Sequence, residues 1–316
     1  MTKKAYFFID DVIWCLRDIT RQKPKSIFDI PFMAMLKKAH DLYGLTVQLN
    51  LFYRTDFFYG NDEFTLAEMT DEYKTEWETN SDWLKMAFHA KQEFPDYPYV
   101  NATYDDVKAN YEAVINEIKR FAGEKSIAHA VIPHWLPISK EGCKALADCG
   151  VKLISPSSGE RTEYTGDPTV LPYGHSFRLL HNRQPETMLC ARMTKNKSLL
   201  SSICGYNHIS QEEHNNTFGT LKAVKDKETG LWFKKLGGGP TINNNNLEDF
   251  NPAYEKRNGD EFIGTGTHEQ YFYSDYYAYQ PDTEEKLLKM AEIMHELEYT
   301  YITADEIINE LSEYTG

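Results

Sequence analysis

Short apolar runs alternate with segments of helical spacing along most of the chain. A short apolar run predicts a buried strand, and apolar residues at every third or fourth position predict a helix that packs by one face. The expected strands are residues 5–10, 45–53, a segment ending at His89, 126–133, 151–155, 260–270 and 299–303. The expected helices are residues 31–43, 62–86, 103–121, 139–148, 283–297 and a last one from Ala304. This alternation predicts parallel βα units, arranged as an open sheet or a closed barrel.

The alternation breaks between residues 156 and 250, where Gly, Pro, Asn and Ser are frequent. We interpret this stretch as a β-rich insertion within a single domain spanning residues 1–316. The segment KDKETGLWFKKL predicts a hairpin that turns at Thr229-Gly230. The insertion could cover the active site, with His181 near the substrate, or it could assist a homo-oligomer.

Composition narrows the classes of partner. The chain has 34 Lys+Arg against 48 Asp+Glu, a net charge of −14, which argues against nucleic acid or an anionic membrane surface because both would repel it. The five cysteines show no CxxC pair, no run reaches the length of a membrane span, and no secretion signal is visible, so we expect a cytoplasmic protein. The 21 tyrosines suit either sugar stacking or packing.

Polar residues stand at the expected strand ends. In a parallel βα fold these ends converge on one face, so residues far apart in sequence gather into one site. The residues in question are Asp10-Asp11, Arg54, His89, His134-Trp135 and His268-Glu269. An aspartate pair could cap a helix, or one carboxylate could bind a metal while the other accepts a proton. Together with the histidines, the pair predicts metal-assisted hydrolysis.

Four segments resemble, in order, the motifs of the NodB-type polysaccharide deacetylase superfamily: FFIDDV, FHAKQEFPDYPY, AVIPHWLPISKEGCKALADCGVKLI and FIGTGTHEQYF. The resemblance implies a distorted (β/α)7-type barrel. It also implies a divalent metal, usually zinc, held by Asp-His-His. The implied reaction removes an acetyl group from an N- or O-acetylated sugar, with an aspartate as general base and a late histidine as general acid.

Carried over motif by motif, the resemblance makes Asp10 the base, Asp11 and His89 metal ligands, and His268 the acid. Two positions depart from the family pattern. The second metal histidine of the family, four residues after the first, is Glu93 here, and the Arg-Pro-Pro-Tyr-like stretch reads IPHWL without the arginine. The third ligand is therefore either Glu93 or His134, and we favour His134 because an imidazole keeps the ligand set chemically similar.

Several further residues are expected to line the groove for a carbohydrate or small-molecule substrate. They are Arg54, Trp135, Tyr97, Tyr271, Glu269 and His181. Two other functions remain open at this point. The barrel could bind a sugar without catalysis, or it could be a glycoside hydrolase that pairs Asp10 or Asp11 with Glu269.

Overall fold

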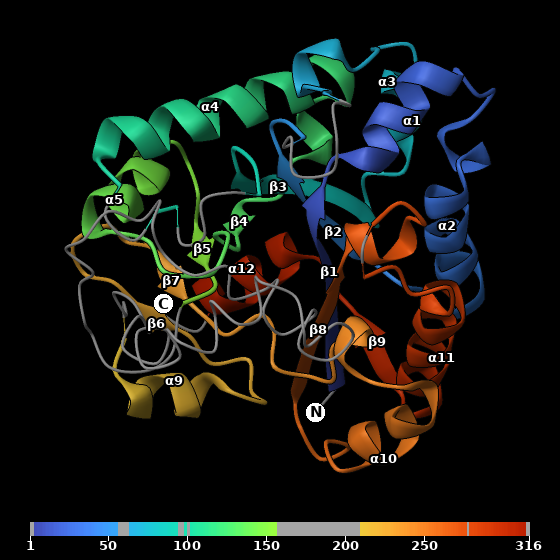
Figure 1. The fold of residues 1–316 in the computed structure, drawn as a ribbon. Helices are drawn as coiled ribbons and strands as arrows, with labels where there is room; N and C mark the ends of the chain where they lie inside the picture. Colours follow the sequence, from blue (N-terminus) through green and yellow to red (C-terminus); the bar gives the residue numbers. More distant parts are fainter. Residues whose placement is uncertain are drawn as a thin grey trace, which may run out of the picture.

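The computed structural model describes residues 3–55, 63–93, 98–99, 102–156, 209–276 and 278–313. Its strands form two sheets (Figure 1). The first has the order β3-β2-β1-β8, with β9 pairing the start of β1, and every pair in it is parallel. Its strands are β1 (Lys3–Val12), β2 (Val47–Phe52), β3 (Leu84–Ala90), β8 (Phe262–His268) and β9 (Tyr299–Tyr301).

The second sheet has the order β4-β5-β7-β6, and only its last pair is antiparallel. Its strands are β4 (Ala130–Val131), β5 (Leu153–Ile154), β6 (Val224–Lys225) and β7 (Trp232–Phe233). Backbone contacts outside the regular ladders join the two sheets on both sides. Met86 forms an isolated parallel bridge with Ile127, and the Gly239 amide donates to the Gly264 carbonyl at 2.7 Å. The wall is thus that of a distorted α/β barrel with two weak seams, and the predicted fold class is confirmed.

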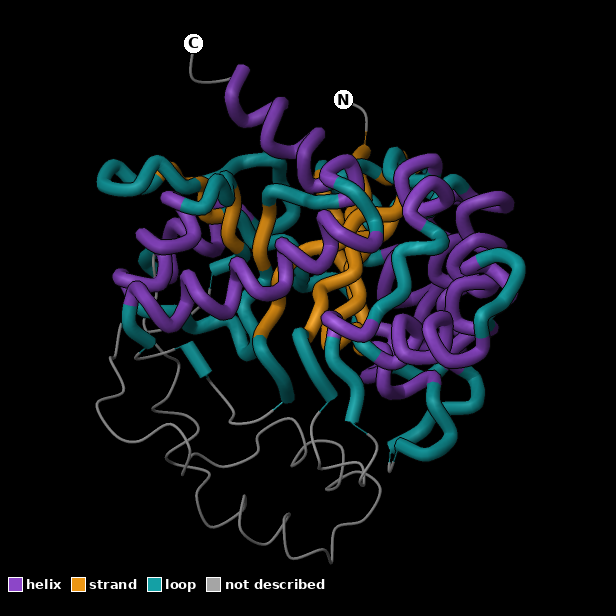
Figure 2. Tube along the Cα trace, turned by 90° about the horizontal axis from the view of Figure 1, so that it is seen from above, coloured by secondary structure: helices purple, strands orange, loops and turns teal. Residues whose placement is uncertain are grey.

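Helices surround these strands, and α12 lies at the same end of the molecule as the start of β1 (Figure 2). The α-helices are α1 (Trp14–Gln22), α2 (Pro31–Tyr43), α3 (Lys74–Thr79), α4 (Tyr104–Phe121), α5 (Lys140–Asp148), α9 (Gln211–Thr217), α10 (Phe250–Glu255), α11 (Thr283–Glu296) and α12 (Ala304–Glu313). Short 3-10 turns are η1 (Ile27–Asp29), η3 (Leu66–Glu68), η4 (Glu124–Ser126), η6 (Ile242–Asn244), η7 (Leu247–Asp249) and η8 (Glu269–Phe272). No helix in the described ranges combines the length and the apolar character needed to cross a membrane.

Local sequence signals explain several helix ends. Gly44 ends α2 in the left-handed conformation, with φ 70°. The hydroxyls of Thr103 and Ser139 accept amide hydrogens at the starts of α4 and α5. These three helices match the predicted ranges to within a residue or two. Helix α4 buries the apolar face that its spacing predicted, from Val107 to Phe121.

The predicted helix over 62–86 is wrong. Within this span the structure contains η3, α3 and the start of β3. Thr65 and Glu68 form a reciprocal cap, but the turn that they begin ends at Met69. The side chain of Asn80 donates to the carbonyl of Glu76, which closes α3 after a short run.

The region predicted as an insertion contributes to the barrel wall in its described part. β6 and β7 form the predicted hairpin, and Gly230 at its turn has φ 75°. β7 also pairs in parallel with β5, so the hairpin continues the second sheet. Residues 157–208 of the predicted insertion lie outside the described residues.

The seam between the sheets yields the first prediction. A Cβ atom added at Gly264 would lie 1.5 Å from the carbonyl oxygen of Leu236, which belongs to the backbone and has no flexible side chain to yield. We expect Gly264→Ala to lower the free energy of unfolding by about 2–3 kcal/mol, as overpacking in a tight core does. Urea denaturation measures the change. Gly259→Ala is the matched control, because a Cβ there meets no atom within 4 Å; equal stability of the two variants would contradict the prediction.

Candidate metal centre

Two β-bulges position the first candidate ligands. Between Ile9 and Val12 strand β1 holds one more residue than its partner β2, and Asp11 there has φ 61°. Strand β3 likewise holds one more residue than β2, at His89. A bulge re-aims side chains that a regular strand would direct to alternate faces. The sequence placed the ends of β1 and β3 to within two residues, but it gave no sign of the bulges.

Three donor atoms from these bulges and from the segment after β4 form a small triangle. Asp11 Oδ1 lies 3.1 Å from His89 Nε2 and 3.3 Å from His134 Nδ1, and the two nitrogens are 3.0 Å apart. All three side chains are buried. Donors about 2.0–2.1 Å from a common zinc ion in tetrahedral geometry lie about 3.3 Å from one another. The triangle therefore has the size that one such ion requires.

Hydrogen bonds to carbonyl oxygens fix the tautomers of both imidazoles. His89 Nδ1 is 2.6 Å from the carbonyl of Ile132, and His134 Nε2 is 3.0 Å from the carbonyl of Glu93. A carbonyl only accepts, so each of these ring nitrogens carries the proton. The other two nitrogens then direct lone pairs toward each other and toward Asp11 Oδ1. That oxygen is buried and has no hydrogen-bond partner among the described residues.

Lone pairs and a carboxylate that converge in a buried space repel one another unless a cation lies between them. Burial opposes protonation of His89, but Asp10 and then Asp11 raise its pKa to about 9, so without a metal a proton on this ring supplies the positive charge between these groups. Burial would also raise the pKa of Asp11, yet the neighbouring His134, and after it His89, hold it well below its usual value. The residues therefore fit a divalent cation. Metal-binding histidines usually donate their outer N–H to a carbonyl or carboxylate, as these two imidazoles do.

Asp10 stands beside the triangle with a separate set of contacts. Asn50 Nδ2 donates to Asp10 Oδ1 at 2.7 Å, and Gln48 Nε2 donates to Asn50 Oδ1 at 2.8 Å. Burial raises the pKa of Asp10, although His89 and His268 oppose the rise. Sequence reasoning missed Asn50 and Gln48. The signal was present, because both are polar residues at alternate positions of an otherwise apolar strand.

A cavity of about 370 Å³ brings several predicted residues to one wall. It is lined by Asp10, His89, His134, Trp135 and His268, among other residues. Asp10 and His268 are direct partners in the pairing of β1 with β8. Trp135 and Leu136 have φ 65° and 73°, so the chain after His134 is held in an uncommon conformation beside this cavity.

Two of the other predicted substrate residues, Tyr271 and Arg54, lie away from this cavity. Tyr271 is fully buried, and Arg54 donates to Gln92 Oε1 at 2.6 Å; neither is among the described residues that line this cavity. Tyr97 and His181 fall outside the described residues, so their roles stay predictions. Glu93 is not part of the group of three donors, which His134 completes instead.

Glu269 is committed to the start of helix α1. Its Oε2 accepts the amides of Ile13 and Trp14 at 2.6 and 2.8 Å, and its Oε1 accepts that of Cys15 at 2.7 Å. No side chain of the local sequence caps this helix. Burial raises the pKa of Glu269 to about 7, and the three amides oppose that rise. The structure thus gives Glu269 a structural role in place of the expected one at the substrate.

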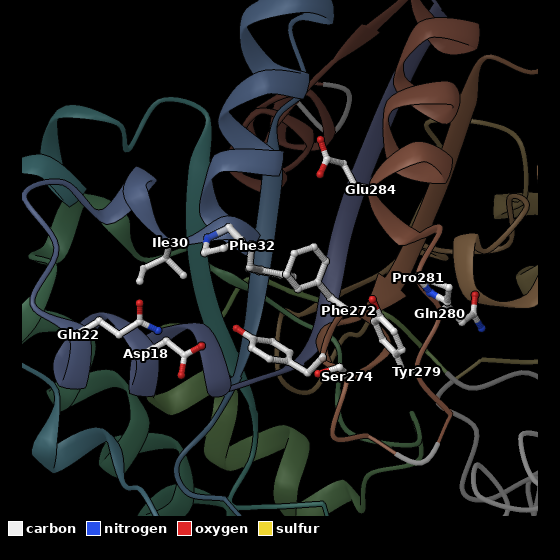
Figure 3. A pocket seen from close by; sticks show the side chains of 12 residues that line it. Asp18, Gln22, Ile30, Phe32, Phe272, Ser274, Tyr279, Gln280, Pro281 and Glu284 are labelled. Carbon is white, nitrogen blue, oxygen red and sulfur yellow. The ribbon is translucent and has the colours of Figure 1, made fainter.

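A larger cavity, of about 460 Å³, lies at a separate place (Figure 3). Residues of α1, α2, η8 and the start of α11 line it, including Asp18, Phe32, Phe272, Tyr279 and Glu284. It contains none of the three donors and neither Asp10 nor His268. The candidate chemistry is therefore concentrated in the smaller cavity.

Comparisons with known proteins agree with the fold. No protein-family model and no curated protein matches the chain. A 4-alpha-glucanotransferase from Thermococcus litoralis matches with a TM-score of 0.53 and 10% identity, over 98% of this chain and 40% of that chain. At this identity the likeness concerns the fold alone, and it supports the architecture described above.

Carbohydrate deacetylases are also among the matching structures. Agd3, a carbohydrate deacetylase, matches with a TM-score of 0.49 and 10% identity over 98% of this chain and 54% of that chain. The Xyl-CE4 domain of a multidomain xylanase from the hindgut metagenome of Trinervitermes trinervoides has a TM-score of 0.44 and 9% identity, over 99% and 92% of the two chains.

The cap formed by Glu269 yields the second prediction. Both of its oxygens accept amide hydrogens, so in Glu269→Gln the new NH2 group would oppose an N–H donor. We expect this variant to lose about 1–3 kcal/mol of unfolding free energy, the cost of a buried unsatisfied donor. Thermal and urea denaturation test it beside Glu255→Gln, which changes an exposed glutamate. A variant at 269 as stable as this control would show that the cap is dispensable.

Proposed function

We propose that the chain is a metal-dependent hydrolase that removes an N- or O-linked acetyl group from a sugar or small amide. The observation that carries the proposal is the buried triangle of Asp11, His89 and His134, whose lone pairs converge on one point. Two imidazoles and one carboxylate suit zinc, and a catalytic zinc site keeps its fourth position for water or substrate.

The chain's own residues divide the remaining work. When bound, the divalent cation would polarise the acyl carbonyl and acidify a water molecule. Asp10 accepts the proton of the attacking water, and the burial that raises its pKa makes it a stronger acceptor. Asn50 occupies Asp10 Oδ1, which leaves Oδ2 for the water. His268, on the neighbouring strand, donates a proton to the departing amine or alkoxide.

Two alternatives receive less support. A glycoside hydrolase that pairs an aspartate with Glu269 needs a free carboxylate there, and three backbone amides already engage it. A sugar-binding barrel without catalysis was suggested by the missing second histidine of the family pattern. His134 supplies an imidazole at the site from another strand end, which favours the catalytic proposal.

Metal binding tests the proposal first. The purified chain should bind one zinc ion, and Asp11→Asn or His134→Gln should weaken zinc affinity by more than about 100-fold, since loss of a group that only orients a metal ligand already costs about 10- to 100-fold. Elemental analysis and chelator competition measure the effect. His129→Gln, at an exposed histidine paired with Asp305, is the control. Unchanged zinc binding in both site variants would refute the centre.

Loss of the base should separate chemistry from metal binding. Asp10→Asn should retain zinc and lower kcat by about 100- to 10,000-fold, the usual contribution of a general base. Acetate release from chitooligosaccharides and from 4-nitrophenyl acetate measures the rate. A variant with wild-type kcat would remove Asp10 from the mechanism, and a wild-type chain that releases no acetate from any acetylated sugar or amide would refute the hydrolase.

A further inference from the structure

Gln270 connects two buried carboxylates beside the triangle of donors. Its Nε2 donates to Asp11 Oδ2 at 2.8 Å and to Glu93 Oε2 at 2.9 Å. All three residues are at most 3% exposed. Only the NH2 end of the amide can donate. Burial and then Asp11 raise the pKa of Glu93 to about 8, but the ionised carboxylate of Asp11 still opposes an amide oxygen in the other orientation, so its contact fixes how Gln270 is oriented.

These contacts decide which oxygen of Asp11 faces the imidazoles. Gln270 holds Oδ2, and Oδ1 is the atom that lies near His89 and His134. An aspartate carboxylate rotates readily about its last bond, because that torsion is broad and roughly two-fold. The hydrogen bond from Gln270 to Oδ2 removes this freedom before any cation binds.

The same contact reaches the third donor through Glu93. The side chain of Glu93 accepts from Gln270, while its backbone carbonyl lies 3.0 Å from His134 Nε2. Glu93 therefore links the amide of Gln270 to the imidazole of His134, whose tautomer its carbonyl fixes. One side chain thus supports donors from two different elements, β1 and the segment after β4.

We propose that Gln270 is a positioning residue that pre-sets Asp11, and through Glu93 also His134, for a divalent cation. The inference rests on the proposed function, since it assumes that the triangle holds a metal. Gln270 contacts the outer oxygen of Asp11, Oδ2, and its NH2 group has no lone pair to offer a cation. Its effect is on the affinity and geometry of the centre, as is usual for groups that orient metal ligands.

The experiment measures metal binding and not turnover. Co²⁺ is titrated into the full chain and followed by visible absorption, and zinc affinity is obtained by chelator competition. Gln270→Met keeps the volume and removes the donor, and it should weaken both metals by about 10- to 100-fold and alter the Co²⁺ spectrum. Gln270→Asn keeps the amide on a side chain one methylene shorter, so it should weaken metal binding as well. It replaces the Met variant in the experiment if that variant does not fold.

A matched control is available at Gln280. This glutamine is also buried, and its amide is equally engaged, by the carbonyl of Asn243 and the ammonium of Lys286, but it touches none of the donors. Gln280→Met should therefore leave the metal affinity and the Co²⁺ spectrum unchanged, whatever it does to stability. A purely structural role for Gln270 predicts that both Met variants behave alike.

The outcomes are distinct for the two proposals. Wild-type affinity and spectrum in Gln270→Met, or an equal loss in Gln280→Met, would overturn the inference while leaving the hydrolase intact. Suppose that Gln270→Met binds both metals more weakly than the wild-type chain and Gln280→Met do, while the wild-type chain releases no acetate from any acetylated substrate. This result would support the positioning role of Gln270 and refute the hydrolase. A wild-type chain that binds neither metal would overturn both.

Discussion

The in-register pairing of β1 with β8 is the constraint on which the site depends. The two strands run parallel from Lys4 beside Phe262 to Asp10 beside His268. Each strand then continues into functional residues, Asp11 on one side and Glu269 and Gln270 on the other. Glu269 anchors the helix that follows β1, and Gln270 anchors Asp11. Because side chains alternate along a strand, a slip of one residue in this pairing would turn each side chain to the other face of the sheet. The contacts of Glu269 with helix α1 and of Gln270 with Asp11 would then be lost together.

The donor set is built from irregular backbone supported by regular strands. Asp11 and His89 lie at bulges, and His134 precedes two residues with positive φ. Each of these features costs folding free energy, which the surrounding ladders of β1, β2, β3 and β8 offset. The polar groups around the donors are themselves tied to the backbone, since carbonyls of Ile132 and Glu93 hold the two imidazoles. These contacts hold the two imidazoles of the candidate site in place without a bound ion.

Many of the strands and several helices could be predicted from the sequence, because they depend on local patterns. Helices α1, α9 and α10 were not predicted. Apolar spacing and caps such as Gly44 and Thr103 act within a few residues, so α2 and α4 were predictable. The role of Glu269 was not, because its partners are more than 250 residues away in the chain. The helix predicted over residues 62–86 was wrong because its helical spacing extends over only part of this span, and Asn80 closes helix α3 after a short run. The choice between His134 and Glu93 required the distances between side chains from separate strands.

The left-handed backbone at Asp11 restricts how this position can vary through evolution. Outside glycine, asparagine and aspartate, a residue with φ 61° carries a steric cost of about 1–2 kcal/mol. Of the three residues that avoid most of this cost, aspartate alone brings a negative charge to the site. Under the proposed function, a relative without the metal could carry asparagine or glycine here at little steric cost, so the identity of this one residue would distinguish relatives that keep the chemistry from those that keep only the fold.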